Sequence, residues 1–332
     1  MSKQELMQTL LEQSEQFGAV FRNVRVEGFD NGFGLVAVNA NADIEISVPK
    51  EMQLSRDAVD MTTGKLKAEA DVPAEYRDWV DRYLSVLLNK DRIEAETAKR
   101  EFVAAMDEET QETFSGMALG NFLNPATEVE TINQFILGNQ FIGSNAGPVL
   151  NPILGLARPG QSALTMQVSA NGSFRVVGKA EEEINVVAGP YDALHALNSM
   201  DHAARFDAAF SVPMAVQLAK GGTLHIGRAF HDKQRVQNMS LPRVSRQGEI
   251  ISVAYMPIGF ANKPRAPREV FRQTLKPFDL ASMDELWSRI RSYNLSTLFK
   301  AYVRVQTLEH AGLKADLSET LTSQIETVLE SI

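Results

Sequence analysis

The sequence predicts an α+β fold with a β-rich core, a helical insert and a carboxy-terminal helical lobe. Short runs of β-forming residues, separated by turn residues, fill residues 21–60 and 141–210. Apolar residues instead recur every three to four positions from residue 74 to about residue 140, which is typical of helices. The 332 residues also exceed the roughly 250–300 at which single cores stop growing, so we expect at least two lobes.

The first 140 residues are predicted to form three segments. Residues 1–20 place leucines among polar residues at the spacing of an amphipathic helix. Residues 21–60 form the first part of the core, in which Asp30-Asn31-Gly32 marks a turn between strands. Residues 61–140 form the helical insert, where aromatic side chains at helical spacing indicate core packing.

Three further segments are predicted in the rest of the chain. Residues 141–210 form the second part of the core, with a hairpin turn at Asn171-Gly172 and a short helix from Asp192 to about Met200. Residues 211–262 supply additional strands, joined at Gly221-Gly222 by what we interpret as a hairpin turn rather than a phosphate cradle. Residues 263–332 form a carboxy-terminal helical domain, introduced by a basic linker over residues 263–271 that contains two prolines.

Composition argues against several classes of function. The chain has no cysteine and five scattered histidines, so we expect no metal site. Its 42 acidic and 33 basic residues give a net charge of -9 without a basic block, which argues against nucleic-acid binding. No run of about 18 apolar residues and no signal peptide is present, so we expect a cytoplasmic protein that does not enter a membrane.

Several local motifs occur in an order known from one protein family. Asn31-Gly32-Phe33-Gly34-Leu35-Val36-Ala37 contains a glycine-x-glycine turn, and Ile46-Ser47-Val48-Pro49-Lys50 follows it. Later come Glu181-Glu182-Glu183-Ile184-Asn185 and Gly189-Pro190-Tyr191-Asp192. Together these motifs resemble the SET-domain protein-lysine methyltransferases, in particular the subclass like the Rubisco large-subunit methyltransferase. The resemblance spans roughly residues 21–207 and implies a SET-like core.

The resemblance also implies a cofactor site for S-adenosylmethionine. Gly32, Phe33 and Gly34 would lie against the cofactor, because glycines allow a close backbone approach. A tight hairpin turn without a ligand is the alternative interpretation of the same glycines. Arg158-Pro159 stands where active members carry asparagine-histidine, so Arg158 would bring a positive charge near a cationic sulfonium.

A second departure from the family falls on the residue that orients the target amine. The family's tyrosine is replaced by Ala188, and Tyr191, three residues later, is the candidate substitute. Loss of an orienting group costs rate, because methyl transfer requires the amine and the methyl group in line.

Three functions are compatible with these features. The chain could be a divergent S-adenosylmethionine-dependent protein-lysine N-methyltransferase with a protein substrate. It could instead be a pseudoenzyme, a SET-like module that binds a protein partner or a ligand without catalysis. A third alternative is a structural protein whose helical tail forms an oligomer. We interpret the acidic run Glu181-Glu182-Glu183 as a solvated turn rather than an acid-base pair.

Overall fold

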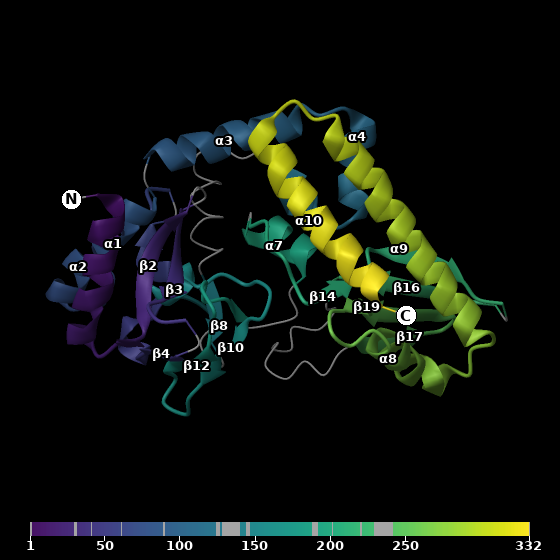
Figure 1. The fold of residues 1–332 in the computed structure, drawn as a ribbon, viewed down its shortest axis with the longest axis horizontal. Helices are drawn as coiled ribbons and strands as arrows, with labels where there is room; N and C mark the ends of the chain where they lie inside the picture. The colour runs from purple at the N-terminus through teal and green to yellow at the C-terminus, as the bar shows by residue number, and fades with distance from the viewer. Residues whose placement is uncertain are drawn as a thin grey trace. The chain divides into compact units, whose positions relative to one another are not determined.

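The computed structural model describes most of the chain (Figure 1). The chain divides into two compact units. Unit 1 comprises residues 1–101 and 125–188, and unit 2 comprises residues 102–124 and 189–332. The described residues are 2–29, 32–40, 42–60, 62–88, 90–123, 127, 140–143, 147–187, 192–200, 202–219, 221–228 and 242–331.

Within its described residues, unit 1 combines small sheets, mostly antiparallel, with three α-helices. Its main sheet has the strand order β1-β4-β12-β11, and β2 pairs with β3 as a separate hairpin. The helices are α1 (Lys3–Gln13), α2 (Ala74–Leu87) and α3 (Lys90–Ala104), whose last turn belongs to unit 2. The strands are β1 (Val20–Arg22), β2 (Val24–Phe29), β3 (Gly32–Ala37), β4 (Asp43–Val48), β5 (Leu54–Ser55), β6 (Val59–Asp60), β7 (Lys65–Leu66), β8 (Gln140–Gly143), β9 (Gly147–Leu150), β10 (Leu164–Thr165), β11 (Gln167–Val168), β12 (Phe174–Lys179) and β13 (Val186–Val187).

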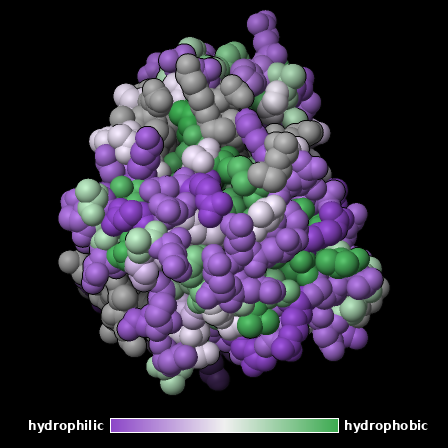
Figure 2. Space-filling view, turned by 90° about the vertical axis from the view of Figure 1, so that its left-hand side faces the viewer, coloured by the Kyte–Doolittle hydropathy of each residue, from purple (hydrophilic) through white to green (hydrophobic). Residues whose placement is uncertain are grey.

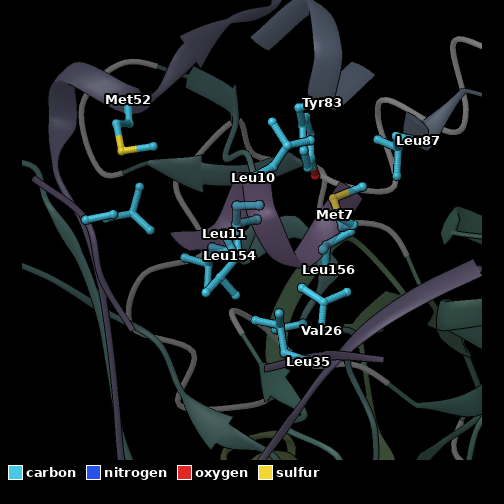
Figure 3. Packing of buried hydrophobic residues seen from close by; sticks show 14 of the residues in the cluster. Met7, Leu10, Leu11, Val26, Leu35, Met52, Tyr83, Leu87, Leu154 and Leu156 are labelled. Atoms are coloured by element: carbon cyan, nitrogen blue, oxygen red, sulfur yellow. The ribbon is translucent and has the colours of Figure 1, made fainter. Parts of the chain in front are cut away.

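The core of unit 1 forms where α1 and α2 pack with the strands. Side chains from α1, β2, β3 and α2 converge there with two leucines of the segment after β9 (Figure 3). Trp79 is fully buried, and its indole Nε1 donates a 3.0 Å hydrogen bond to the backbone oxygen of Leu10. This bond joins α2 to α1 and satisfies the one polar atom of the indole ring.

Unit 2 is built from a four-stranded sheet, a second strand pair and a group of helices. The sheet order is β15-β16-β18-β17, in which β16 and β18 run parallel, and β14 pairs with β19. The helices are α4 (Glu108–Gly116), α5 (Gly120–Leu123), α7 (Ala193–Met200), α8 (Ala266–Leu275), α9 (Met283–Gln306) and α10 (Ala311–Glu330). The strands are β14 (Ala208–Phe210), β15 (Met214–Gln217), β16 (Thr223–Gly227), β17 (Arg243–Gln247), β18 (Ile250–Ala254) and β19 (Pro257–Phe260).

Helix α10 is held against the strands by polar as well as apolar contacts. The Ser323 hydroxyl accepts from the Phe206 backbone N–H at 3.1 Å, and the Thr327 hydroxyl donates to the Phe206 backbone oxygen at 3.2 Å. Strand β19 approaches so closely that a Cβ on Gly259 would lie 2.4 Å from the backbone oxygen of Thr327. Only glycine allows this spacing without a shift of the helix.

The predicted α+β class is confirmed by this mixture of helices and strands. The hairpin turns at Asn171-Gly172 and Gly221-Gly222 are also confirmed, since Gly172, Gly221 and Gly222 have positive φ between antiparallel strands. The predicted linker over residues 263–271 is wrong for most of its length. Helix α8 begins at Ala266, because a proline in the first helical turn has no intrahelical N–H bond to lose.

The predicted segments do not coincide with the two units. Residues 61–140 divide between them, since 102–124 belong to unit 2. The segments 211–262 and 263–332 share one hydrophobic core, to which β16, β18, α9 and α10 all contribute. On the face shown in Figure 2, hydrophilic residues predominate and apolar residues lie in scattered patches.

Candidate functional site

The hairpin of β2 and β3 carries the predicted cofactor-binding glycines. Gly32 has a φ of 128°, which favours glycine, and it pairs with Phe29 across the hairpin. Phe33 is buried. Gly34 has no left-handed φ, yet a Cβ at this position would lie 2.6 Å from Cε2 of Phe29. The glycine at 34 therefore makes room for the ring of Phe29.

Backbone hydrogen bonds join this hairpin to the acidic run at residues 181–185 and, through it, to the segment at Arg158. The Ile184 N–H donates to the Leu35 oxygen at 2.8 Å, and the Ala37 N–H donates to the Glu182 oxygen at 2.8 Å. The Val186 N–H in turn donates to the Arg158 oxygen at 2.9 Å. The hairpin and the acidic run, which are far apart in the sequence, are thus neighbours within unit 1.

Arg158 has acidic neighbours on this surface. Its pKa lies below the ordinary value because burial disfavours the charged guanidinium, and the carboxylates of Glu183 and Glu96 offset this effect only in part. Partial burial raises the pKa of Glu183, and the charge of Arg158 acts in the opposite direction. Glu96 also pairs with Lys99 at 3.6 Å, so the two carboxylates lie beside two cationic side chains.

Glu183 also borders the glycine of the hairpin. The residue as a whole is exposed, but its Oε1 lies 3.5 Å from the position that a Cβ on Gly34 would take. The interpretation of residues 181–183 as a solvated turn agrees with their exposure. It did not include this contact of Glu183 with the hairpin. A carboxylate between Gly34 and Arg158 could not be identified from the run of three glutamates.

The residues around Gly34 do not fit S-adenosylmethionine while Phe29 lies as described. A ring carbon already fills the space beside the Gly34 α-carbon, so a ligand would reach that backbone only after the ring moved. Phe29 is 40% exposed, which leaves room for such a movement.

Asn151 is a further polar group in the same unit. It follows β9 directly, is fully buried, and within the described part of the chain neither its Oδ1 nor its Nδ2 has a hydrogen-bond partner. Burying an amide without partners costs about 1–3 kcal/mol per unsatisfied group. Asn151 immediately precedes the segment Pro152–Pro159, which the resemblance places beside the cofactor.

The predicted catalytic position, Tyr191, and Ala188 both lie outside the described residues. The next residue, Asp192, is the N-cap of α7, and its Oδ1 accepts from the His195 backbone N–H at 2.9 Å.

Asp192 is the centre of a polar cluster that sequence reasoning missed. Its carboxylate is fully buried and forms a bidentate pair with Arg228, at 2.8 Å to Nη1 and 2.7 Å to Nη2. The Phe210 N–H and the Gln324 side chain also donate to it, each at 2.9 Å. Burial would raise the pKa of Asp192, but the charge and hydrogen bonds of Arg228 outweigh it, so the pKa lies below its usual value.

Two other titratable side chains lie beside this pair. Burial lowers the pKa of His195, an effect that Asp192 opposes and Arg228 reinforces. Burial raises the pKa of Tyr255, whose ring centroid is 6.2 Å from that of His195 and whose φ is 55°. The one sequence signal for this cluster was an aspartate before a helix, which predicts an N-cap but not a buried ion pair.

Two general features of the described residues bear on function. None of their helices is long and apolar enough to cross a bilayer. Their histidine, aspartate and glutamate side chains also form no group of three or more that could hold a metal ion.

Comparisons with known proteins find distant similarities. No protein-family model matches the sequence. An uncharacterized protein of Aquifex aeolicus (strain VF5) is 26% identical over 118 residues, which cover 35% of this chain and 97% of that protein.

Two solved structures are similar over most of the chain. The SET domain of LSMT bound to lysine and AdoHcy is 14% identical, with a TM-score of 0.39 over 98% of this chain and 89% of that chain. Rubisco LSMT bound to sinefungin and monomethyllysine is 13% identical, with a TM-score of 0.40 over 98% and 90%. These similarities do not assign the chain to a family.

Proposed function

We propose that this chain is a SET-like protein that recognises a partner protein and does not transfer methyl groups. The observation that carries the proposal is the ring of Phe29, which fills the space beside Gly34 where the cofactor would approach. The replacement of the orienting tyrosine by Ala188 supports it, because alanine has no side-chain hydrogen-bonding group. The net charge of -9 favours a protein rather than a nucleic acid as the partner. We propose the cytoplasm as its location.

The SET-like part of the proposal is supported by connectivity within unit 1. The glycine-x-glycine hairpin and the acidic run at residues 181–185 are separated in sequence, and backbone hydrogen bonds join them to each other and to the segment at Arg158. This support is independent of the overall superposition on solved structures.

A divergent S-adenosylmethionine-dependent protein-lysine methyltransferase is the second candidate, and two observations favour it. The charge of Arg158 is accompanied by Glu183 and Glu96, which weakens the objection that a guanidinium would repel a sulfonium. Asn151 also offers a buried amide without a partner among the described residues, and an amide can hydrogen-bond a ligand's polar groups.

Calorimetric titration with S-adenosylmethionine and its demethylated product distinguishes the two candidates. The recognition proposal predicts no binding of either ligand to the unmodified protein at millimolar concentration. It also predicts that Phe29→Ala binds S-adenosylmethionine more tightly than the unmodified protein does, if the Phe29 ring alone blocks the space beside Gly34. Phe299→Ala is the matched control, because Phe299 is 46% exposed and lies in unit 2.

The opposite result would favour the enzyme. Micromolar binding of either ligand to the unmodified protein would refute the claim that Phe29 blocks the space beside Gly34. It would also justify a screen for methyl-accepting proteins. In that case Asn151→Leu should weaken binding at unchanged helical content, since leucine has a similar volume and no polar group.

A further inference from the structure

A cavity in unit 2 has features of a small-molecule site. Its volume is about 310 Å³, and it is lined by the β15–β16 turn, the β17–β18 hairpin and the connection between α8 and α9. Ligand pockets usually span about 300–1,000 Å³, so this cavity suits a small ligand. The proposed SET-like function makes no use of it.

The cavity has an apolar floor. Ile251 is buried, and Leu218, Phe278 and Leu280 are half-buried side chains that pack against the main hydrophobic core of unit 2. These four side chains would receive an apolar group of a ligand and remove it from water.

The wall between the two hairpins is tightly packed. A Cβ on Gly222 would lie 2.4 Å from the backbone oxygen of Glu249, and the Thr223 N–H donates to that same oxygen at 3.0 Å. Backbone contacts thus hold together the two turns from which Gly221 and Glu249 enter the lining.

Opposite charges line the cavity without pairing with each other. Arg246, Glu249 and Asp279 contribute to its lining, and among the described residues no ion pair joins Arg246 to Glu249. Nε of Arg246 donates to the Gly248 oxygen at 3.0 Å, which tethers the guanidinium and leaves its two Nη groups available. A guanidinium binds a carboxylate bidentately, and a carboxylate binds an ammonium group.

We propose that this cavity binds an apolar α-amino acid. The ligand's carboxylate is held by Arg246, its ammonium group by Glu249, and its side chain by the floor of Leu218, Ile251 and Phe278. A phosphate ligand would find one guanidinium beside two repelling carboxylates, those of Glu249 and Asp279. A purely apolar ligand would displace water from these charged groups and offer them no hydrogen bond in return. A zwitterion with an apolar side chain satisfies all three parts of the cavity.

The test is calorimetric titration of the full chain with leucine, leucine amide and N-acetylleucine. Leucine amide lacks the carboxylate and N-acetylleucine lacks the ammonium group, so each probe removes one proposed contact. We expect leucine to bind saturably and each probe to bind about tenfold more weakly, the effect of one charged hydrogen bond.

Variants assign each contact to its residue. Arg246→Gln should weaken leucine binding about tenfold and leave the binding of leucine amide unchanged. Glu249→Gln should also weaken leucine binding about tenfold, and it should leave the binding of N-acetylleucine unchanged. Arg243→Gln, on the same strand but outside the lining, should bind leucine like the unmodified protein. Absence of saturable leucine binding, or equal loss of all three compounds in both variants, would overturn the proposal. Arg246 and Glu249 are exposed and Arg243 is half-buried, and a thermal melt verifies that each variant is folded.

Discussion

Gly34→Ala tests whether Gly34 serves the packing of Phe29. The backbone at 34 is not left-handed, so alanine is allowed there as far as φ is concerned. The obstacle is the contact of 2.6 Å between the new Cβ and Cε2 of Phe29. Carbon atoms that do not bond approach to about 3.5–4.0 Å, so the ring must move outward by roughly 1 Å.

The cost of that movement follows from how much of the ring is buried. Phe29 is 40% exposed, so about three fifths of it is buried, and full burial of a phenylalanine contributes about 1.5–3 kcal/mol. The displaced ring should therefore lose at most about 1–2 kcal/mol, and alanine in a strand recovers about 0.5–1 kcal/mol, so Gly34→Ala should lower the free energy of unfolding by about 1 kcal/mol. Phe29→Ala removes the ring's contacts altogether and should cost about 1–2 kcal/mol.

The two substitutions should not be additive, because the ring can lose its contacts only once. The double variant should be about as stable as Phe29→Ala alone, or slightly more, since alanine is better than glycine in a strand by about 0.5–1 kcal/mol. Urea denaturation of the four proteins measures this as a coupling energy of about 1–2 kcal/mol in magnitude. Gly28→Ala is a control on the same hairpin, where the new Cβ would meet only the end of the Gln4 side chain, at 3.4 Å.

Additive effects would refute this reasoning, since they would mean that Gly34 and Phe29 act separately. The result also governs how activity tests are designed. A loss of ligand binding in Gly34→Ala alone would not establish cofactor contact, because the same substitution displaces Phe29. Ligand binding should be compared in the Phe29→Ala background, where residue 34 can be changed without that clash.

Three further predictions concern unit 2. Gly259→Ala should lower the free energy of unfolding by about 3 kcal/mol or more, because its Cβ meets the backbone of α10, whereas Gly227→Ala, with no atom within 4 Å, should show little effect in the same urea titration. Asp192→Ala should cost about 3–5 kcal/mol in chemical denaturation, since it leaves the charge of Arg228 buried, and a loss below 1 kcal/mol would contradict this. Because the pKa of His195 is lowered on folding, the unfolded state binds more protons than the folded state. Stability should therefore fall as the pH drops below about 6.5, and thermal melts of His195→Gln should show a smaller fall in melting temperature over the same pH range.

The helices and turns were predictable because their signals are local. Leucines at helical spacing identified α1, and the capping box at Ser2 and Glu5 agrees with where it begins. Two consecutive glycines identified the β15–β16 turn because both positions need positive φ. The start of α8 was missed because prolines there were interpreted as signs of a linker, although proline is favoured in a first helical turn.

The candidate site was predictable only in part. The glycine-x-glycine turn and the segment at Arg158 were identified, and the structure places both on one surface of unit 1. The ring that covers Gly34 was not foreseen, because a diagonal contact across a hairpin depends on register and side-chain direction. Tyr191 stays a prediction.

The sequence by itself determined the α+β class, the positions of most helices and turns, and the resemblance that directed attention to Gly34 and Arg158. Only the tertiary structure decided which charges are paired and which glycines make room for a close neighbour. It also decided that the last two predicted segments share one core. Asp192 and Arg228 are 36 positions apart and look like ordinary surface residues in the sequence. Periodicity reports that a face is buried but not what it is buried against, so long-range pairings have no local signal.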